Sequence, residues 1–153
     1  MALQLIHCAA PGFSPDHKTA MKFARYTFLA AGIYGVIVLV PQYFLLERNG
    51  RDFPPAITHP EYYYGFVGVA LVFQLIFFVI STNPIKYRAL IGISIFEKLA
   101  FAVPAAILFF GNMLSASMFA AGMIDAVLGI LFVVSFIKVK PHRDDQLASE
   151  YIN

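Results

Sequence analysis

The chain has 153 residues, of which 59% are hydrophobic and 13% are charged, and its mean hydropathy is +0.72. Soluble domains carry roughly 25% charged residues, so this composition excludes an ordinary soluble protein and predicts an integral membrane protein. The net charge of +2 is small, and the basic residues lie at the ends of apolar segments, which argues against nucleic-acid binding.

Four apolar segments are each long enough to cross a hydrocarbon core of about 30 Å as a helix. They are predicted at residues 26–46, 62–80, 89–110 and 117–137. The predicted fold class is therefore all-α, a single four-helix transmembrane bundle over residues 26–137. Residues 1–25 precede it as an N-terminal segment and interfacial helix start, and residues 138–153 follow as a polar tail.

The first helix is predicted to start at Ser14–Asp16, because Ser14 is a good N-cap and proline suits the first helical position. Pro41 predicts a kink near the far end of the first span. The connection over residues 47–61 is rich in turn signals, including Asn49-Gly50 and the paired prolines at 54–55, so we expect an ordered irregular loop or a short cap.

Later in the chain, Asn83 and Pro84 end the second span, and Pro104 predicts another kink in the third. The connection over residues 111–116 is short and uncharged, so the third and fourth spans form an antiparallel hairpin. Asp125 lies among small residues of the fourth span, on a face suited to close helix packing.

The orientation follows from the positions of lysine and arginine. Eight of the eleven lie on the side that holds both chain ends and the second connection, and Lys98 lies within a span. Only Arg48 and Arg51 lie on the opposite side. Because cytoplasmic segments are enriched in basic residues, both termini are predicted to be cytoplasmic, and we expect a bacterial inner membrane.

Polar side chains from all four spans reach a common depth, which we call the polar layer. At about 1.5 Å per residue, Asp125 lies roughly 18 to 20 Å from the cytoplasmic edge and the residues from the other spans roughly 10 to 14 Å. Lys98 is long enough to reach Asp125 across the hairpin, and Ser94 is placed to bond either Glu97 or Lys98. The members of the layer are Tyr34, Gln74, Ser94, Glu97, Lys98 and Asp125.

Two readings of this layer stay open. In the structural reading, Lys98 neutralises one acid, Gln74 and Tyr34 satisfy the other, and the network determines which helices pair. In the functional reading, two acids against one base leave a surplus negative charge, so one acid holds a proton near neutral pH or a cation enters. The second reading predicts a proton-relay or ligand-binding layer.

Several chemistries have no support in the sequence. No glycine-rich phosphate loop, HExxH helix, GxSxG elbow or CxxC pair is present, and Cys8 is the only cysteine. The four histidines fall outside the predicted spans, which argues against a haem held by two of them within the bilayer. We therefore expect no cofactor and no metal, and catalysis, if present, to be acid–base chemistry at Glu97 and Asp125.

In size, four-span topology and the short charged turn at Lys86 and Arg88, the chain resembles the DoxX-like family of bacterial membrane proteins. That resemblance implies association with quinol oxidases or other redox complexes. The segment Leu71–Phe78, LVFQLIFF, is similar to the second helix of the EXPERA superfamily of sterol isomerases and ligand-binding proteins. In that superfamily an acidic residue precedes this segment, whereas Ala70 stands there in this chain.

These observations lead to an expected function and an alternative. We expect a non-enzymatic membrane protein, either an accessory subunit of a membrane complex or a binder of a lipophilic small molecule. Its partners would be membrane lipids, a membrane protein or a second copy of the chain, and a small lipophilic ligand. The alternative is an EXPERA-like acid–base isomerase or a proton-coupled carrier that uses Glu97 and Asp125.

Overall fold

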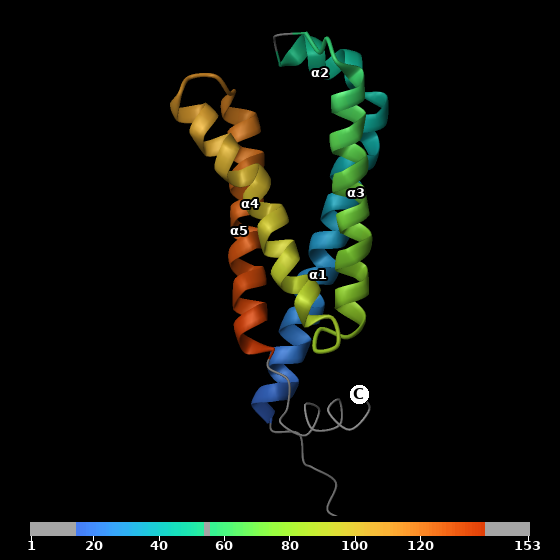
Figure 1. The fold of residues 1–153 in the computed structure, drawn as a ribbon, viewed down its shortest axis with the longest axis vertical. Coiled ribbons are helices and arrows are strands. Elements are labelled where there is room, and N and C mark those ends of the chain that lie inside the picture. The colour runs from blue at the N-terminus through green and yellow to red at the C-terminus, as the bar shows by residue number, and fades with distance from the viewer. Residues whose placement is uncertain (1–14, 54–55, 140–153) are drawn as a thin grey trace, which may run out of the picture.

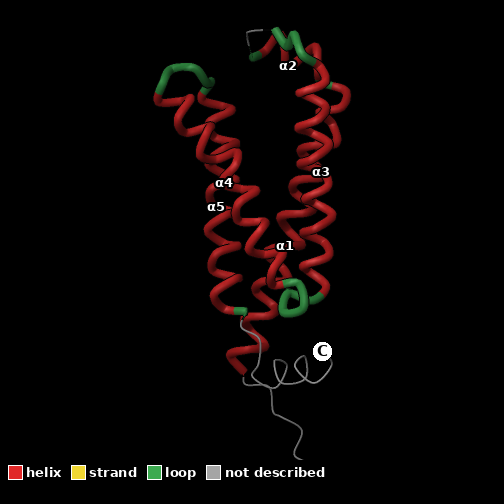
Figure 2. Tube along the Cα trace, viewed as in Figure 1, coloured by secondary structure: helices red, strands yellow, loops and turns green. Residues whose placement is uncertain are grey.

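The computed structural model describes residues 15–53 and 56–139, and within this part of the chain the secondary structure consists of helices joined by short turns and loops, with no strand (Figure 2). The predicted N-cap Ser14, the paired prolines at 54–55 and the tail from residue 140 lie outside the described residues. The helices are α1 (Pro15–Leu39), a 3₁₀ helix η1 (Val40–Phe44), α2 (Leu46–Asp52), α3 (Pro60–Thr82), α4 (Arg88–Phe110) and α5 (Ala116–Lys138).

Four of these segments are long and apolar enough to cross a membrane, which supports an integral membrane protein. They are Lys18–Phe44, Pro60–Thr82, Arg88–Phe110 and Ala116–Lys138. Proline marks a change of helix type in the first of these segments and the end of the second. Pro41 lies in the first turn of η1, where the α-helix gives way to a 3₁₀ helix, and Asn83 and Pro84 follow α3 directly.

The four long helices form two antiparallel pairs, α1 with α3 and α4 with α5 (Figure 1). The two pairs come together at the end that holds the start of α1 and the turn between α3 and α4. They diverge toward the opposite end, where α2 and the turn between α4 and α5 lie (Figure 1). The most extensive contact between the pairs is made by α1 with α5, and α3 contacts α4 less extensively.

The core lies at the end where the pairs converge. Phe28 of α1, Phe77 of α3 and Phe132 of α5 are fully buried. The rings of Phe28 and Phe132 stack at 4.1 Å, and Phe77 meets Phe132 edge-on at 5.1 Å between ring centroids. Such aromatic pairs add about 0.5 to 1.5 kcal/mol beyond their buried area. This aromatic cluster joins the two helix pairs below the polar layer.

The described part of the connection after η1 contains the short helix α2, which agrees with the predicted short cap. Asn49 of α2 donates hydrogen bonds from Nδ2 to Gln42 Oε1 at 2.6 Å and to the Tyr63 hydroxyl at 2.8 Å. The Tyr63 hydroxyl in turn donates to the backbone carbonyl of Gln42 at 2.9 Å. These bonds attach the cap to the start of α3.

Arg88 holds the other end of the hairpin together. From the first turn of α4, it donates from Nε to the Val139 carbonyl at 2.7 Å and from Nη2 to the Phe136 carbonyl at 3.1 Å. Its guanidinium also lies 3.7 Å from the centre of the Phe136 ring. The last carbonyls of a helix lack partners within it and carry partial negative charge, so Arg88 satisfies and neutralises the end of α5.

Candidate functional site in the polar layer

Lys98 is the centre of the polar layer. The residue is 5% exposed, and its Nζ atom lies 3.1 Å from Asp125 Oδ1 of α5. The same atom lies 3.4 Å from Oε1 and 3.3 Å from Oε2 of Glu97, its neighbour on α4. The contact between Lys98 and Asp125 that the sequence predicts is therefore present, and Lys98 contacts both acids.

The two acids differ in how well Lys98 satisfies them. The hydrogen bond from Lys98 Nζ is shorter to Asp125 Oδ1, at 3.1 Å, than to Glu97 Oε1, at 3.4 Å, and Glu97 is adjacent to Lys98 in the sequence. Glu97 Oε2 is buried and accepts no hydrogen bond, although Lys98 Nζ is near it. Glu97 is thus the acid with unused acceptor capacity.

Small residues let α5 approach this part of α4. Asp125 lies between Gly122 and Gly129 of α5, which are one turn away on either side. A Cβ at Gly122 would lie 2.6 Å from Ala105 Cβ, and one at Gly129 would lie 3.4 Å from Lys98 Cβ. The close packing of the two backbones brings the Asp125 carboxylate within reach of the lysine.

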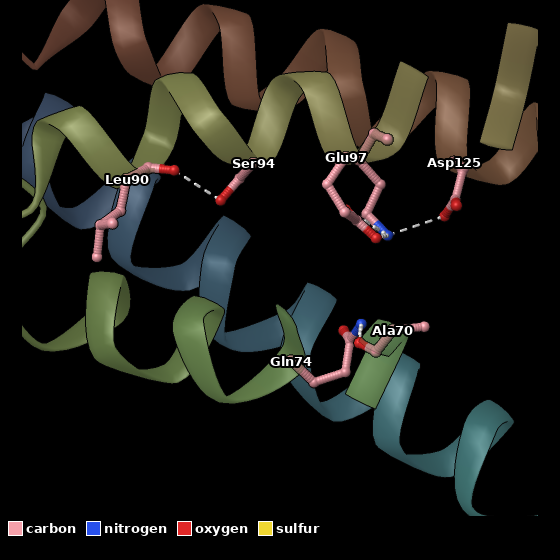
Figure 3. Close-up of polar contacts among 7 residues, drawn as sticks. Ala70, Gln74, Leu90, Ser94, Glu97 and Asp125 are labelled. Atoms are coloured by element: carbon pink, nitrogen blue, oxygen red, sulfur yellow. Dashed lines mark hydrogen bonds and ion pairs between the residues drawn. The ribbon is translucent and has the colours of Figure 1, made fainter. Parts of the chain in front are cut away.

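Gln74 reaches the layer from α3 and lies across from the acids of α4 and α5 (Figure 3). The residue is 2% exposed, and Nε2 donates to the Ala70 carbonyl of its own helix at 2.8 Å. Oε1 is buried without a hydrogen-bond donor. Gly35 of α1 makes room for the carboxamide, because a Cβ at that position would overlap it.

Two members behave differently from the prediction. Ser94 is fully buried, but its hydroxyl donates to the Leu90 carbonyl at 2.8 Å and bonds neither Glu97 nor Lys98 (Figure 3). For a serine inside a helix, the nearest acceptor is a backbone carbonyl of the preceding turn, and the hydroxyl bonds that carbonyl in preference to a side chain farther away. Tyr34 is 37% exposed and lies within electrostatic range of Asp125 without a hydrogen bond to it.

Neither Gln74 nor Tyr34 satisfies the second acid, so that part of the structural reading is wrong for the described residues.

Aromatic residues bound the layer on two sides, and the sequence did not single them out for this position. Phe77 of the aromatic cluster has its ring centre 5.2 Å from Lys98 Nζ, close enough for a cation–π contact. One turn beyond Glu97, the ring of Phe101 lies 5.8 Å from that of Phe66 on α3. The spacing of three residues between Gln74 and Phe77 is the sequence signal that places these two on one face.

No group of three or more histidine, cysteine or acidic side chains able to hold a metal is found among residues 15–53 and 56–139.

We compared the chain with protein-family models, with curated proteins and with solved structures, and none of the three comparisons finds a match. The resemblances to the DoxX-like family and the EXPERA superfamily thus have no support from a family match.

Proposed function

We propose that this protein is a non-enzymatic, membrane-embedded binder of a lipophilic small molecule whose polar head contacts the polar layer. The observation that carries the proposal is the unsatisfied hydrogen-bonding capacity of the layer. Glu97 Oε2 and Gln74 Oε1 are both buried and accept no hydrogen bond, although Glu97 Oε2 lies 3.3 Å from Lys98 Nζ, and they belong to different helix pairs.

A layer with a purely structural role is expected to satisfy its buried atoms, because each unpaired buried polar group costs about 1 to 3 kcal/mol. Here the lysine and its two acids belong to the α4–α5 pair and Gln74 to α3, and α3 packs against α4 far less extensively than α5 does. A ligand head that donates hydrogen bonds at this level would relieve that cost, while its apolar part would stay in the hydrocarbon region.

The proposal is tested by identifying what the protein carries after purification in mild detergent. Solvent extraction and mass spectrometry of the wild type are expected to reveal one enriched lipophilic compound. Gln74→Leu, which keeps the side-chain volume but removes the carboxamide, is expected to lower its amount roughly fivefold, the equivalent of one hydrogen bond. Ser135→Ala is the matched control, because the Ser135 hydroxyl bonds only the Leu131 carbonyl of its own helix.

An equal compound profile in wild type and Gln74→Leu would mean that the extracted lipid merely surrounds the bundle, and the proposal would fail. A stoichiometric protein partner and no enriched compound would instead support the accessory-subunit role.

The acid–base isomerase or proton-coupled carrier is the second candidate, and the surplus of one acid over Lys98 favours it. It predicts that Glu97→Gln and Asp125→Asn each abolish turnover or proton-linked transport while the fold is kept. Measurement of both variants with the compound identified above separates it from simple binding, in which turnover is absent from the wild type as well.

A further inference from the structure

We propose that the lipophilic ligand is an amphiphile whose head is a protonated primary amine, held by Glu97 and Asp125 opposite Gln74. This inference rests on the proposed binding function and specifies its ligand class. It follows from three properties of the layer: its charge, its unused hydrogen-bonding atoms and its aromatic neighbours.

The charge balance favours a monovalent cation. Glu97 and Asp125 share the single ammonium group of Lys98, so the ionised cluster carries one net negative charge. The other described charged side chains lie toward the ends of the long helices or in the cap. From α1 the titratable neighbour is the Tyr34 hydroxyl, and from α3 the neutral Gln74 faces the cluster. A ligand with one positive charge would complete this balance within the membrane, where an unpaired charge is costly.

The unused atoms favour a head rich in donors. Glu97 Oε2 and Gln74 Oε1 are buried and accept no hydrogen bond. Both atoms are acceptors. A primary ammonium group has three N–H donors and no acceptor, whereas a hydroxyl group has one donor. The ammonium group therefore matches the open atoms in kind, and it has enough donors to bond both of them and the Asp125 carboxylate as well.

Gln74 provides a reason for ligand binding that does not depend on the charges of Glu97, Asp125 and Lys98. It is an uncharged, almost fully buried side chain of the other helix pair that lies across from the cluster, with its Oε1 against Gly35 of α1 (Figure 3). A buried carboxamide oxygen without a donor carries a desolvation cost whatever the protonation state of Glu97. A proton on Glu97 would balance the charge of the cluster. Gln74 Oε1 would still accept no hydrogen bond among its described contacts.

The aromatic neighbours suit a cation with an apolar chain. Phe77 already lies beside the ammonium group of Lys98, and a cation near an aromatic face gains electrostatic attraction in a desolvated site. On the other side of the layer, Phe66 and Phe101 are in contact across α3 and α4. An alkyl chain attached to the amine would lie along these two helices beside that ring pair.

The experiment compares three probes with the same chain length: dodecylamine, dodecanol and dodecanoate. Each is added at neutral pH to the full-length protein in an uncharged maltoside detergent. Binding is measured by native mass spectrometry and by the midpoint of thermal unfolding. Dodecylamine is expected to bind with a stoichiometry of one and to raise the midpoint, and the other two probes are expected to do neither.

Variants assign the binding to the layer. Glu97→Gln and Asp125→Asn are each expected to weaken dodecylamine binding by roughly tenfold or more, as loss of a charge-assisted contact would. Glu61→Gln is the matched control, since Glu61 lies exposed at the start of α3 and contacts His59. Circular dichroism establishes that each variant keeps its helices. If one variant does not fold, the comparison of the three probes on the wild type still tests whether the protein prefers an amine head.

Tight dodecanol binding equal to that of dodecylamine would overturn the amine inference and leave the proposed binding function intact. Dodecylamine binding that is unchanged in both folded variants would overturn the assignment of Glu97 and Asp125. Failure of all three probes to bind saturably would overturn the amine inference. Together with the absence of any enriched compound from the purified wild type, that result would also end the proposed function.

Discussion

At the scale of single residues, Lys98 has the largest effect on the polar layer, because both acids depend on it. Lys98→Met keeps much of the apolar volume but leaves Glu97 and Asp125 buried without a cation. Removing one partner of a buried ion pair typically costs about 3 to 5 kcal/mol. We expect a loss of that order in the free energy of unfolding, measured by denaturant or thermal unfolding in mild detergent.

Two further variants check the reason for that loss. Adding Asp125→Asn to Lys98→Met is expected to restore part of the stability, because it removes one uncompensated charge. Lys86→Met is the control for lysine removal, since Lys86 is exposed in the turn between α3 and α4. Wild-type stability of Lys98→Met would show that both acids are already neutral in the protein.

Arg88 is the second residue with a specific structural role. Arg88→Met would remove two hydrogen bonds to the end of α5, at Phe136 and Val139. Hydrogen bonds that involve a charged group contribute about 1.5 to 3 kcal/mol each, but α5 ends near water, so we expect a loss of about 1 to 3 kcal/mol in total. Hydrogen exchange should rise in the last turn of α5 first; unchanged exchange there would contradict the capping role.

At the scale of elements, the pairing of α4 with α5 depends on glycine. Gly122→Val would place a branched side chain where a single Cβ already comes within 2.6 Å of Ala105. Overpacking of this kind costs about 1 to 3 kcal/mol or more, since the helices must move apart. Because Asp125 is one turn away, we also expect a weaker contact with Lys98.

Gly65→Ala of α3 is the matched control, since a Cβ there meets no atom within 4 Å. Its stability is expected to stay within about 0.5 kcal/mol of the wild type. Thermal unfolding of both variants in the same detergent makes the comparison. Equal stability of Gly122→Val and Gly65→Ala would mean that α4 and α5 do not pack as closely as described.

At the scale of the whole molecule, the side of the membrane on which each end lies is still a prediction from the distribution of basic residues. It is tested with single cysteines in a Cys8→Ala background and a membrane-impermeant maleimide. Asn112→Cys, in the turn between α4 and α5, is expected to react in intact cells, and Lys86→Cys only after the membrane is opened. The reverse labelling pattern would place both termini outside.

Much of the fold follows from local chemistry and can therefore be predicted from the sequence. Long apolar segments must be helical in a hydrocarbon environment, because each backbone N–H and carbonyl group needs a partner within its own segment. Pro41 and Pro84 mark breaks for an equally local reason, since proline lacks a backbone donor. The short turn after α4 likewise requires that α4 and α5 be neighbours.

The sequence predicts which residues make up the polar layer, but it predicts only some of the contacts between them. The sequence predicts the contact of Lys98 with Asp125, because the hairpin and the helical rise together set their relative heights. It did not predict that Ser94 bonds Leu90, or that Gln74 bonds Ala70 and rests on Gly35. Those outcomes depend on which acceptor is nearest in three dimensions.

By itself, then, the sequence determines four helices long and apolar enough to span a membrane, with two acids and one base in their middle parts, since hydropathy and residue identity are local properties. The tertiary structure decides the rest: α1 pairs with α3, the two helix pairs diverge at one end, and Glu97 and Gln74 retain open acceptors. These features arise from how the helix faces pack in space, and packing depends on contacts between residues far apart in the chain.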